Sequence, residues 1–308
     1  MTATHASVSV GKDPGHDPGT AHTAPRSAPR RPVVRGRALR TTGFHLTAGL
    51  LSALWLLPIA LVLVTSTRTF DDIAAHGVGS WPRSFTLDGF QQAWVDGGQQ
   101  QALINSMIVS VPTVLLSLGL ASMAAFALSR YDLPFRRVLL LLMLGGNLLP
   151  PQILLIPVSK LSEVLGIYDQ LYALIGVQVG FGVGFYVFVL HGFMRAIPGE
   201  IQQAAVIDGA SPWQIYWRII LPLARPALAA LTALSFTWIF NDLLWAITVL
   251  RTDSQMPITA SLIGLQGQYV SMWNVIAAGS VIAAAPTVAV FLRFQRHFVA
   301  GLNLGAVK

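Results

Sequence analysis

Long apolar runs, separated by short polar stretches, constrain this chain more than any other feature of its sequence. Crossing the hydrocarbon core of a bilayer takes about 20 consecutive, mostly apolar residues in helical form. Only 11% of the residues are charged and the mean hydropathy is +0.61, which places the chain outside the soluble class. The sequence therefore predicts an all-α, polytopic membrane protein with six transmembrane helices, at residues 44–65, 102–128, 138–158, 171–193, 226–250 and 273–292.

Basic residues set the predicted orientation. Residues 1–43 are rich in Pro, Gly, Ser, Thr, Ala and Arg, which predicts a disordered, basic cytoplasmic tail whose arginines contact membrane lipid. The predicted external loops are 66–101, a second loop marked by Lys160, Glu163 and Asp169, and 251–272. Four of the 20 lysines and arginines then fall outside the cell: Arg68, Arg83, Lys160 and Arg251. Both termini are therefore predicted to be cytoplasmic. Because the net charge of +7 follows membrane topology, it does not predict nucleic-acid binding.

The polar stretch 196–223 lies between the fourth and fifth apolar runs and is too polar to sit in hydrocarbon. Glu200 in the first turn of a helix complements the helix dipole, and Gly209 offers the left-handed conformation that commonly ends helices. Ser211 and Gln214 have the spacing of a capping box, so a second helix begins at once. The sequence predicts a helix, a glycine turn and a second helix, which we call the elbow. By periodicity alone, it is equally typical of an interfacial helix pair that only joins two spans.

The residues of the elbow also carry a resemblance to a known family. With Gln203-Ala204-Ala205, Asp208-Gly209-Ala210 and Ile220-Leu221-Pro222 at these spacings, the elbow resembles the EAA loop of ABC-importer permeases. In that family the loop is a cytoplasmic coupling helix that sits in a cleft of the ATPase subunit and transmits its closure. Gln203 stands where the family usually has a glutamate, so a charged contact becomes a neutral hydrogen bond. The resemblance assigns ATPase coupling to Glu200, Gln203, Ala204, Ala205, Asp208, Gly209, Ala210, Leu221 and Pro222.

Further motifs extend the resemblance over nearly all of the predicted transmembrane permease domain, residues 44–308. They are similar to the second permease of maltose-type sugar importers, and they comprise Asn105-Ser106, 124–130, the prolines from Pro150 to Pro157, Asn241-Asp242 and 305–308. The resemblance implies a multi-pass subunit of the cell membrane that imports a sugar or oligosaccharide. It also implies partners, namely a second homologous permease subunit, two copies of a cytoplasmic ATP-binding subunit and an extracytoplasmic solute-binding protein. Other solutes stay open, because the binding protein largely sets selectivity.

Two of the predicted spans carry features that are unusual in hydrocarbon. The prolines between positions 150 and 157 predict a kinked or broken third span, which either lines a transport path or only packs against its neighbours. Asp242 is the one carboxylate inside a predicted span, where burial costs about 2.5 to 3.5 kcal/mol. With Asn241 and Trp238 nearby, it forms a candidate substrate path in which the carboxylate accepts hydrogen bonds from sugar hydroxyls. A hydrogen bond to the partner permease is the alternative role.

The sequence predicts no catalytic, cofactor or metal site. It lacks a G-x-x-x-x-G-K-[ST] phosphate loop, so ATP hydrolysis by that machinery falls to a separate subunit. It has no cysteine, and its histidines show no metal-ligand spacing such as H-E-x-x-H. A self-sufficient transporter driven by protons or sodium is the rival function, although it needs intramembrane ionisable relays and Asp242 stands alone. An intramembrane enzyme is the weakest rival, because no nucleophile–base pair appears.

Overall fold

The computed structural model describes the backbone of residues 35–268 and 272–306, and the side chains of residues 43–268 and 272–295. The chain divides into two compact units, Met1–Trp55 and Leu56–Lys308. In the first unit, the described backbone is the N-terminal part of helix α1, which begins at Arg35. Residues 1–34 of the predicted tail lie outside the described residues. The regular elements of the described backbone are all helices, with no strand among them, as the sequence predicts.

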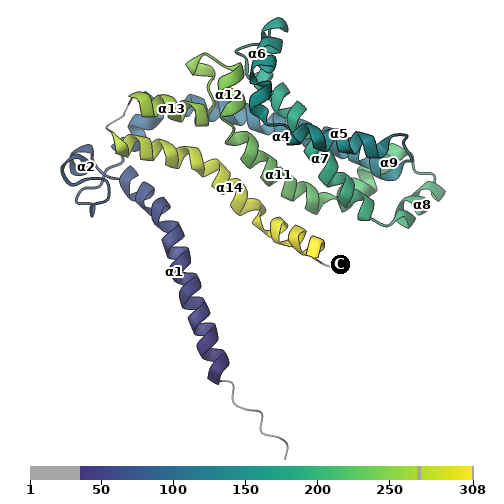
Figure 1. Ribbon diagram of the computed structural model, residues 1–308, viewed down its shortest axis with the longest axis horizontal. Coiled ribbons are helices and arrows are strands. Elements are labelled where there is room, and N and C mark those ends of the chain that lie inside the picture. Colours follow the sequence, from purple (N-terminus) through teal and green to yellow (C-terminus); the bar gives the residue numbers. More distant parts are fainter. Residues whose placement is uncertain (1–34, 269–271, 307–308) are drawn as a thin grey trace, which may run out of the picture. The chain divides into compact units, whose positions relative to one another are not determined.

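Figure 1 shows the helices in chain order. Up to the elbow they are α1 (Arg35–Ser66), α2 (Phe70–His76), α3 (Asp88–Gln91), the π-helix η1 (Gln92–Asp96), α4 (Gln99–Arg130), α5 (Arg136–Leu148), the 3₁₀-helix η2 (Pro151–Leu154), α6 (Leu155–Val164) and α7 (Leu171–Ala196). From the elbow onward they are α8 (Gly199–Ile207), α9 (Pro212–Ile215), the π-helix η3 (Tyr216–Ile220), α10 (Leu221–Leu223), α11 (Arg225–Phe240), α12 (Leu244–Val249), the 3₁₀-helix η4 (Asp253–Gln255), α13 (Ile258–Gln268) and α14 (Trp273–Ala306).

The helices supply between four and six membrane spans. Four continuous segments are long and apolar enough to cross a bilayer, namely Gly43–Ser66, Gln99–Arg130, Leu171–Ala196 and Trp273–Gln295. Two more pass the same test as bent pairs, Arg136–Leu148 with Pro151–Val164 at 89° and Pro212–Leu223 with Arg225–Phe240 at 73°. Counting each bent pair as one span gives six, the number that the sequence predicts, although the second pair includes the polar stretch 212–223 and the predicted fifth span is 226–250.

Helix α4 lies at the centre of the second unit. It packs along α7 and against α11, while α5 lies on α7 and α14 lies on α11 (Figure 1). Side chains of these helices form one apolar core, whose fully buried members include Leu174, Leu190, Met194 and Phe240. Ile220 of the elbow is also fully buried in this core. The elbow is therefore fixed to the bundle by apolar packing as well as by its chain connections.

The predicted break in the third span is confirmed. Proline has no N–H to donate, so Pro150 and Pro151 stop helix α5 and turn the chain into η2 and α6. Close packing of α5 on α7 depends on Gly184, because a Cβ atom at that position would lie 2.7 Å from the carbonyl oxygen of Met143. The break and the glycine together bring the bent chain against the middle of α7.

The fifth span ends earlier than predicted. The sequence predicts one helix over 226–250, but α11 stops at Phe240 and α12 begins at Leu244. The side-chain Nδ2 of Asn241 donates to the carbonyl of Thr237 at 2.8 Å, which its own N–H also reaches at 3.2 Å. Asparagine and aspartate side chains compete with the helical backbone in this way and favour helix ends. Asp242 consequently lies in a break between two helices and not in a helix interior.

The stretches predicted as external loops also contain helices, which corrects that prediction. The stretch 66–101 holds α2, α3 and η1, and the stretch 251–272 holds η4 and α13. These helices are too short and too polar to span a bilayer, so their hydrophobicity alone does not separate them from loops. A local signal for α2 is present in the sequence, because Thr69 caps the helix by accepting the N–H of Asp72 at 3.3 Å.

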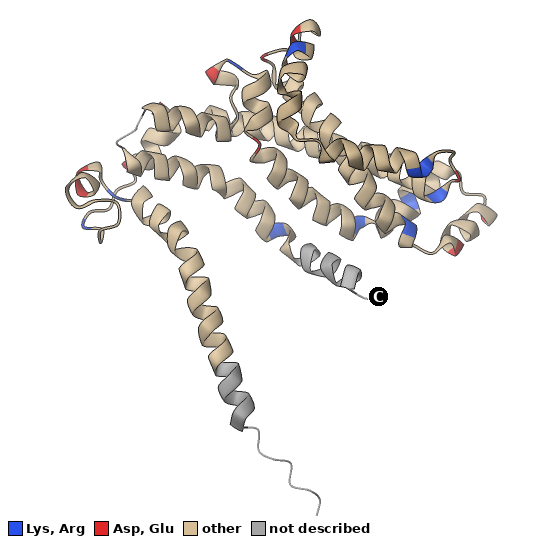
Figure 2. Cartoon of the chain, in the orientation of Figure 1, with Lys and Arg blue, Asp and Glu red and all other residues tan. Residues whose placement is uncertain are grey.

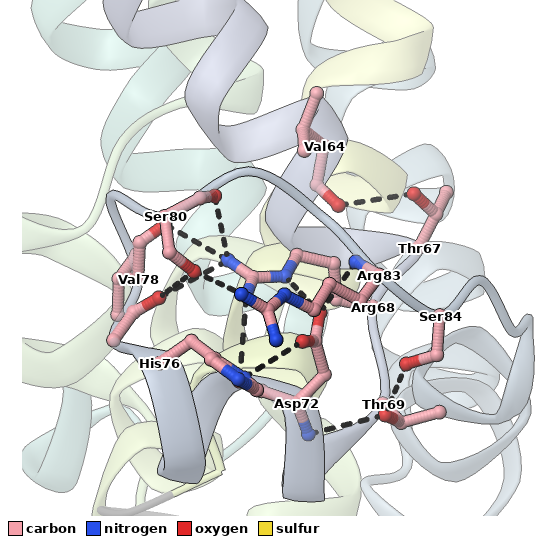
Figure 3. Close-up of polar contacts among 11 residues, drawn as sticks. Val64, Thr67, Arg68, Thr69, Asp72, His76, Val78, Ser80, Arg83 and Ser84 are labelled. Carbon is pink, nitrogen blue, oxygen red and sulfur yellow. Dashed lines mark hydrogen bonds and ion pairs between the residues drawn. The ribbon is translucent and has the colours of Figure 1, made fainter.

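One buried arginine organises the chain around α2 (Figure 3). The side chain of Arg68 is fully buried, and its Nε donates to Asp72 Oδ2 at 2.8 Å. Its other nitrogens donate to the carbonyl oxygens of Gly77, Val78 and Ser80 and to the Ser80 hydroxyl. The hydrogen bond from Arg68 lowers the pKa of the Asp72 carboxyl below its usual value. A guanidinium that satisfies this many acceptors holds the whole turn from residue 66 to residue 80 in place.

Charged side chains lie at the ends of the long helices in the second unit (Figure 2). Arg130 is the last residue of α4, Arg136 is the first of α5 and Arg225 is the first of α11. All three helix ends adjoin the end of the bundle that carries the elbow, where the basic residues that Figure 2 shows gathered are arginines. The elbow end of the bundle is therefore basic, as the sequence-based topology requires.

Candidate functional site

The first half of the elbow is a short helix closed by a glycine turn. After α8, Gly209 adopts a φ of 79°, in the left-handed region where any side chain is strained. The N–H of Ala210 donates to the carbonyl of Ala205 at 2.9 Å, and the N–H of Gly209 donates to that of Val206 at 3.0 Å. This pair of bonds is the Schellman motif, which satisfies the last carbonyls of a helix. The predicted helix and glycine turn are confirmed.

The second half of the elbow begins with a complete capping box. The Ser211 hydroxyl accepts the N–H of Gln214 at 3.3 Å, and the Gln214 side-chain oxygen accepts the N–H of Ser211 at 2.8 Å. From there the chain stays helical through η3 and α10 as far as Leu223. The π-helix η3 widens this helix by one residue, a feature often found at functional sites.

The outer surface of the elbow is exposed and partly apolar. The side chain of Ile207 is 85% exposed and that of Val206 is 57% exposed, so large apolar groups lie next to the glycine turn. Five of the nine predicted coupling residues are exposed, namely Glu200, Gln203, Ala204, Asp208 and Gly209. Ala205 is buried, and Ala210, Leu221 and Pro222 are half-buried. The structure brings these residues together on one rigid elbow, which is suited to docking against another surface.

A hydrogen bond and an aromatic contact join the elbow to α4. The hydroxyl oxygens of Tyr216 and Ser122 are 2.7 Å apart, and both side chains are buried. The ring of Tyr216 also packs on Phe126, with ring centroids 5.3 Å apart. One turn further along α4, Arg130 donates to the carbonyl of Met194 at 2.6 Å, near the end of α7 where the chain enters the elbow. The elbow therefore contacts α4 through specific groups and not only through the chain that follows it.

A second candidate site is a cavity of about 300 Å³ beside the two broken spans. Aromatic rings form much of its wall, since Phe181 stacks on Trp245 at 4.7 Å and Phe185 packs on Trp238 at 5.4 Å between ring centroids. Trp238 is 53% exposed, so one aromatic face is open. The cavity is lined by Asn147, Pro151, Gln178, Phe181, Gly182, Phe185, Tyr186, Trp238, Ile239, Asp242 and Trp245. Aromatic faces with a few convergent polar groups are typical of sites for small molecules.

Two of the three predicted substrate-path residues line the cavity, and the third does not. Asp242 and Trp238 line the cavity, and the Asp242 Oδ2 atom accepts a hydrogen bond from Gln178 at 3.0 Å. Asn241 lies elsewhere, since its side-chain nitrogen reaches Thr287 of α14 at 3.4 Å. The backbone break between α11 and α12 explains this divergence, because successive residues in a turn point in different directions.

Sequence reasoning missed Gln178 as part of this site. Its amide carries two donor hydrogens and an acceptor oxygen, and its nitrogen donates to Asp242. A glutamine inside the apolar run 171–193 is a polar group that needs a hydrogen-bond partner when buried, and that signal was available. Where side chains are described, no cluster of three or more His, Asp or Glu residues is placed to hold a metal ion.

At the opposite end of α4 from the elbow, residues 250–258 form a short ordered segment, which we call the opposite segment. Asp169, in the turn between α6 and α7, accepts the N–H groups of Arg251 at 2.7 Å and of Thr252 at 3.0 Å. Asp169 has a φ of 62°, which is uncommon for a residue with a side chain. Asn105 of α4 binds the same segment by donating a hydrogen bond to the carbonyl of Ser254. The opposite segment thus takes its shape from residues far away in the sequence.

Comparisons with known proteins agree with this architecture. Residues 102–303 match the family model described as binding-protein-dependent transport system inner membrane component. The chain belongs to this family. The alpha-glucoside transport system permease protein AglG of Rhizobium meliloti is 35% identical over 74% of this chain and 61% of its own length. A probable starch degradation products transport system permease protein, AmyC of Thermoanaerobacterium thermosulfurigenes, is 32% identical over 84% of this chain and 93% of its own.

The permease also shares its fold with a solved structure. A bacterial ABC transporter involved in the import of the acidic polysaccharide alginate contains a chain that is 23% identical, with a TM-score of 0.73, over 86% of the permease and 98% of that chain. Within the permease, the matched range 102–303 includes the elbow, the cavity and the opposite segment. Membership in the family identifies the chain as a transport component and not as an enzyme.

Proposed function

We propose that the permease is one half of the membrane domain of an ATP-driven importer and that its elbow docks on a cytoplasmic ATPase subunit. The observation that carries this proposal is the elbow itself, a rigid helix–turn–helix with exposed apolar and polar residues inside the range that matches the family. ATP-driven closure of the ATPase pair moves the elbow, and the helices behind it rock between inward-facing and outward-facing arrangements.

The proposed assembly contains a second homologous permease subunit, two copies of the ATP-binding subunit and an extracytoplasmic solute-binding protein. The family description, which names binding-protein-dependent transport, supports the last of these. The basic elbow end supports a cytoplasmic elbow and cytoplasmic termini in the cell membrane. Exposed leucines along the spans, such as Leu115, Leu141 and Leu142, are suited to contact lipid or the second permease.

The proposed solute is a sugar or oligosaccharide. The printed names of AglG and AmyC refer to alpha-glucosides and starch degradation products, which supports a sugar for this chain. The cavity offers complementary chemistry, because the exposed face of Trp238 suits the apolar face of a sugar ring and Asp242 and Gln178 suit its hydroxyl groups. On this proposal the carboxylate of Asp242 contacts solute during its passage.

Reconstitution tests the proposed function. The permease, its partner permease and the ATPase are placed in proteoliposomes, with solute-loaded binding protein outside and ATP inside. We expect uptake that requires ATP, the ATPase subunits and the binding protein together. Uptake that continues without the ATPase and follows an imposed proton or sodium gradient would instead identify an ion-driven transporter.

Variants at Asp242 test the substrate path. We expect Asp242→Asn and Asp242→Ala to lower solute uptake about threefold to tenfold while assembly with the partner subunits is normal, because a hydrogen-bond acceptor for the solute is lost. Glu163→Gln is the control, since Glu163 is an exposed carboxylate of α6 that does not line the cavity. Normal uptake by the Asp242 variants, together with weaker assembly, would contradict a role in the path and assign the carboxylate to a subunit contact.

A further inference from the structure

Two buried hydrogen-bond clusters fasten α4, one at each end. At the elbow end, the hydroxyl groups of Ser122 and Tyr216 are bonded across 94 residues of sequence. At the other end, Asn105 Nδ2 donates to the carbonyls of Ser254 at 2.8 Å and Met256 at 3.1 Å. These side-chain contacts join one helix to two segments that lie at opposite ends of the bundle.

The contact at the second end is completed by the neighbouring residue, Ser106. Its hydroxyl accepts the N–H of Ile258 at 2.8 Å, so it caps the start of α13. Asn105 and Ser106 are 2% and 1% exposed, which means that neither bond competes with bulk water. Asn105 and Ser106 therefore hold the carbonyl groups of the opposite segment and the start of the helix that follows it, α13.

Two routes through the protein connect the elbow with the opposite segment. Along the chain, the elbow leads into α11, but that helix is interrupted at residues 241–243 before α12 reaches the opposite segment. Helix α4, in contrast, is a single helix from Gln99 to Arg130, which the proline inside it, Pro112, does not interrupt. From Ser122 to Asn105 it spans about 25 Å at 1.5 Å per residue. A continuous helix transmits a displacement better than one that is broken midway.

We propose that α4 is a strut that couples the elbow to the opposite segment, with Ser122, Tyr216, Asn105 and Ser106 as its positioning residues. When the elbow moves with the ATPase, the bond between Tyr216 and Ser122 carries that movement into α4, and Asn105 and Ser106 pass it to the opposite segment. This inference rests on the proposed function, because the elbow moves only if an ATPase drives it.

A single thiol tests the strut. The chain contains no cysteine, so Ser254→Cys places one exposed reporter on the opposite segment. The assembled complex in proteoliposomes is labelled with a membrane-impermeant thiol reagent, without nucleotide and with ATP trapped by vanadate, and the rate of the complex without the reporter is subtracted. We expect the labelling rate at the reporter to differ between the two nucleotide states.

Variants of the strut should reduce this difference. We expect Ser122→Ala and Tyr216→Phe each to reduce the nucleotide-dependent change in labelling rate about threefold, the effect of losing one hydrogen bond in a membrane interior. Asn105→Asp removes the side-chain donor but keeps nearly the same side-chain size, and it should reduce the nucleotide-dependent change in labelling rate in the same way. Combining it with Ser122→Ala should add little, because both changes interrupt one link.

Two control variants alter residues near the elbow end of α4 that do not bond to the elbow. Ser129→Ala removes a hydroxyl that bonds only within α4, to the carbonyl of Phe126, and Tyr131→Phe alters a ring in the same aromatic cluster. Both should keep the wild-type response. A wild-type response in Ser122→Ala and Tyr216→Phe, in complexes that show ATP-driven uptake, would overturn the strut. If the wild-type complex shows no ATP-driven uptake, the proposed function fails, and the strut fails with it.

Discussion

The elbow and the opposite segment are both short polar stretches at the ends of α4, but different contacts give them their shapes. Every hydrogen bond that shapes the elbow turn joins residues no more than five positions apart, as between Ala210 and Ala205. The opposite segment is held by Asp169, 82 residues away from Arg251, and by Asn105, 149 residues away from Ser254. The elbow therefore keeps its own geometry when it is pushed, whereas the opposite segment follows the helices that hold it.

The largest expected effect comes from breaking the local geometry of the elbow. We expect Gly209→Val to lower ATP-driven uptake more than about tenfold, because a β-branched residue at positive φ costs more than the roughly 1–2 kcal/mol of the left-handed conformation. Gly199→Ala is the matched control, since a Cβ atom at position 199 has no neighbour within 4 Å and its φ is not in the left-handed region. Uptake by Gly209→Val at the wild-type rate would show that the turn is not needed for coupling.

A smaller effect is expected from releasing the opposite segment. Asp169→Ala removes the acceptor of the Arg251 and Thr252 amides, so the Ser254→Cys reporter should be labelled about threefold faster in every nucleotide state. Glu163→Ala is a control of equal charge change at an exposed position of α6. An unchanged labelling rate in Asp169→Ala would mean that α4 alone determines the shape of the segment.

The same comparison explains what could be predicted from the sequence. Ser211, Gln214 and Gly209 specify the elbow through local rules of helix capping, and the structure has these features where the sequence places them. The role of Asn105 in holding Ser254 and Met256 depends on a contact across 149 residues, and no local rule predicts it. The apolar runs predict the spans, but they do not show the break after Phe240, which depends on the hydrogen bond from the Asn241 side chain to the carbonyl of Thr237.

The pH dependence of the opposite segment follows from Asp169. Hydrogen bonds from the Thr252 hydroxyl, and then from the amides of Thr252 and Arg251, lower the pKa of its carboxyl below the ordinary 3.8. A carboxyl with a lower pKa in the folded state stabilises the segment above its unfolded pKa and loses that contribution as the pH falls through the folded value. Protection of the Arg251 and Thr252 amides against hydrogen exchange, corrected for intrinsic rates, should therefore hold from about pH 5 and fall below about pH 3.8.

Asp169→Asn serves as the control for this titration. An amide at position 169 does not ionise, so protection should show no step across the same pH range. A step of equal size in the variant would place the titrating group elsewhere.

The smallest effect is expected at Gln203. Its side chain is exposed on the elbow, and exposed charge pairs contribute little, so Gln203→Glu should change ATP-driven uptake less than about twofold. In that case the glycine turn and the apolar contacts around Ile207 carry the docking. A several-fold rise in uptake would show that the elbow is weakened by the glutamine and regains a salt bridge to the ATPase.

Crosslinking from the two ends of α4 tests the central claim most directly. Ile207→Cys on the elbow and Ser254→Cys on the opposite segment are placed singly in the cysteine-free chain, and a short photo-activated crosslinker is attached in the assembled complex. The account predicts an adduct with the ATPase subunit from position 207 and none from position 254. An ATPase adduct from position 254, with none from position 207, would contradict it.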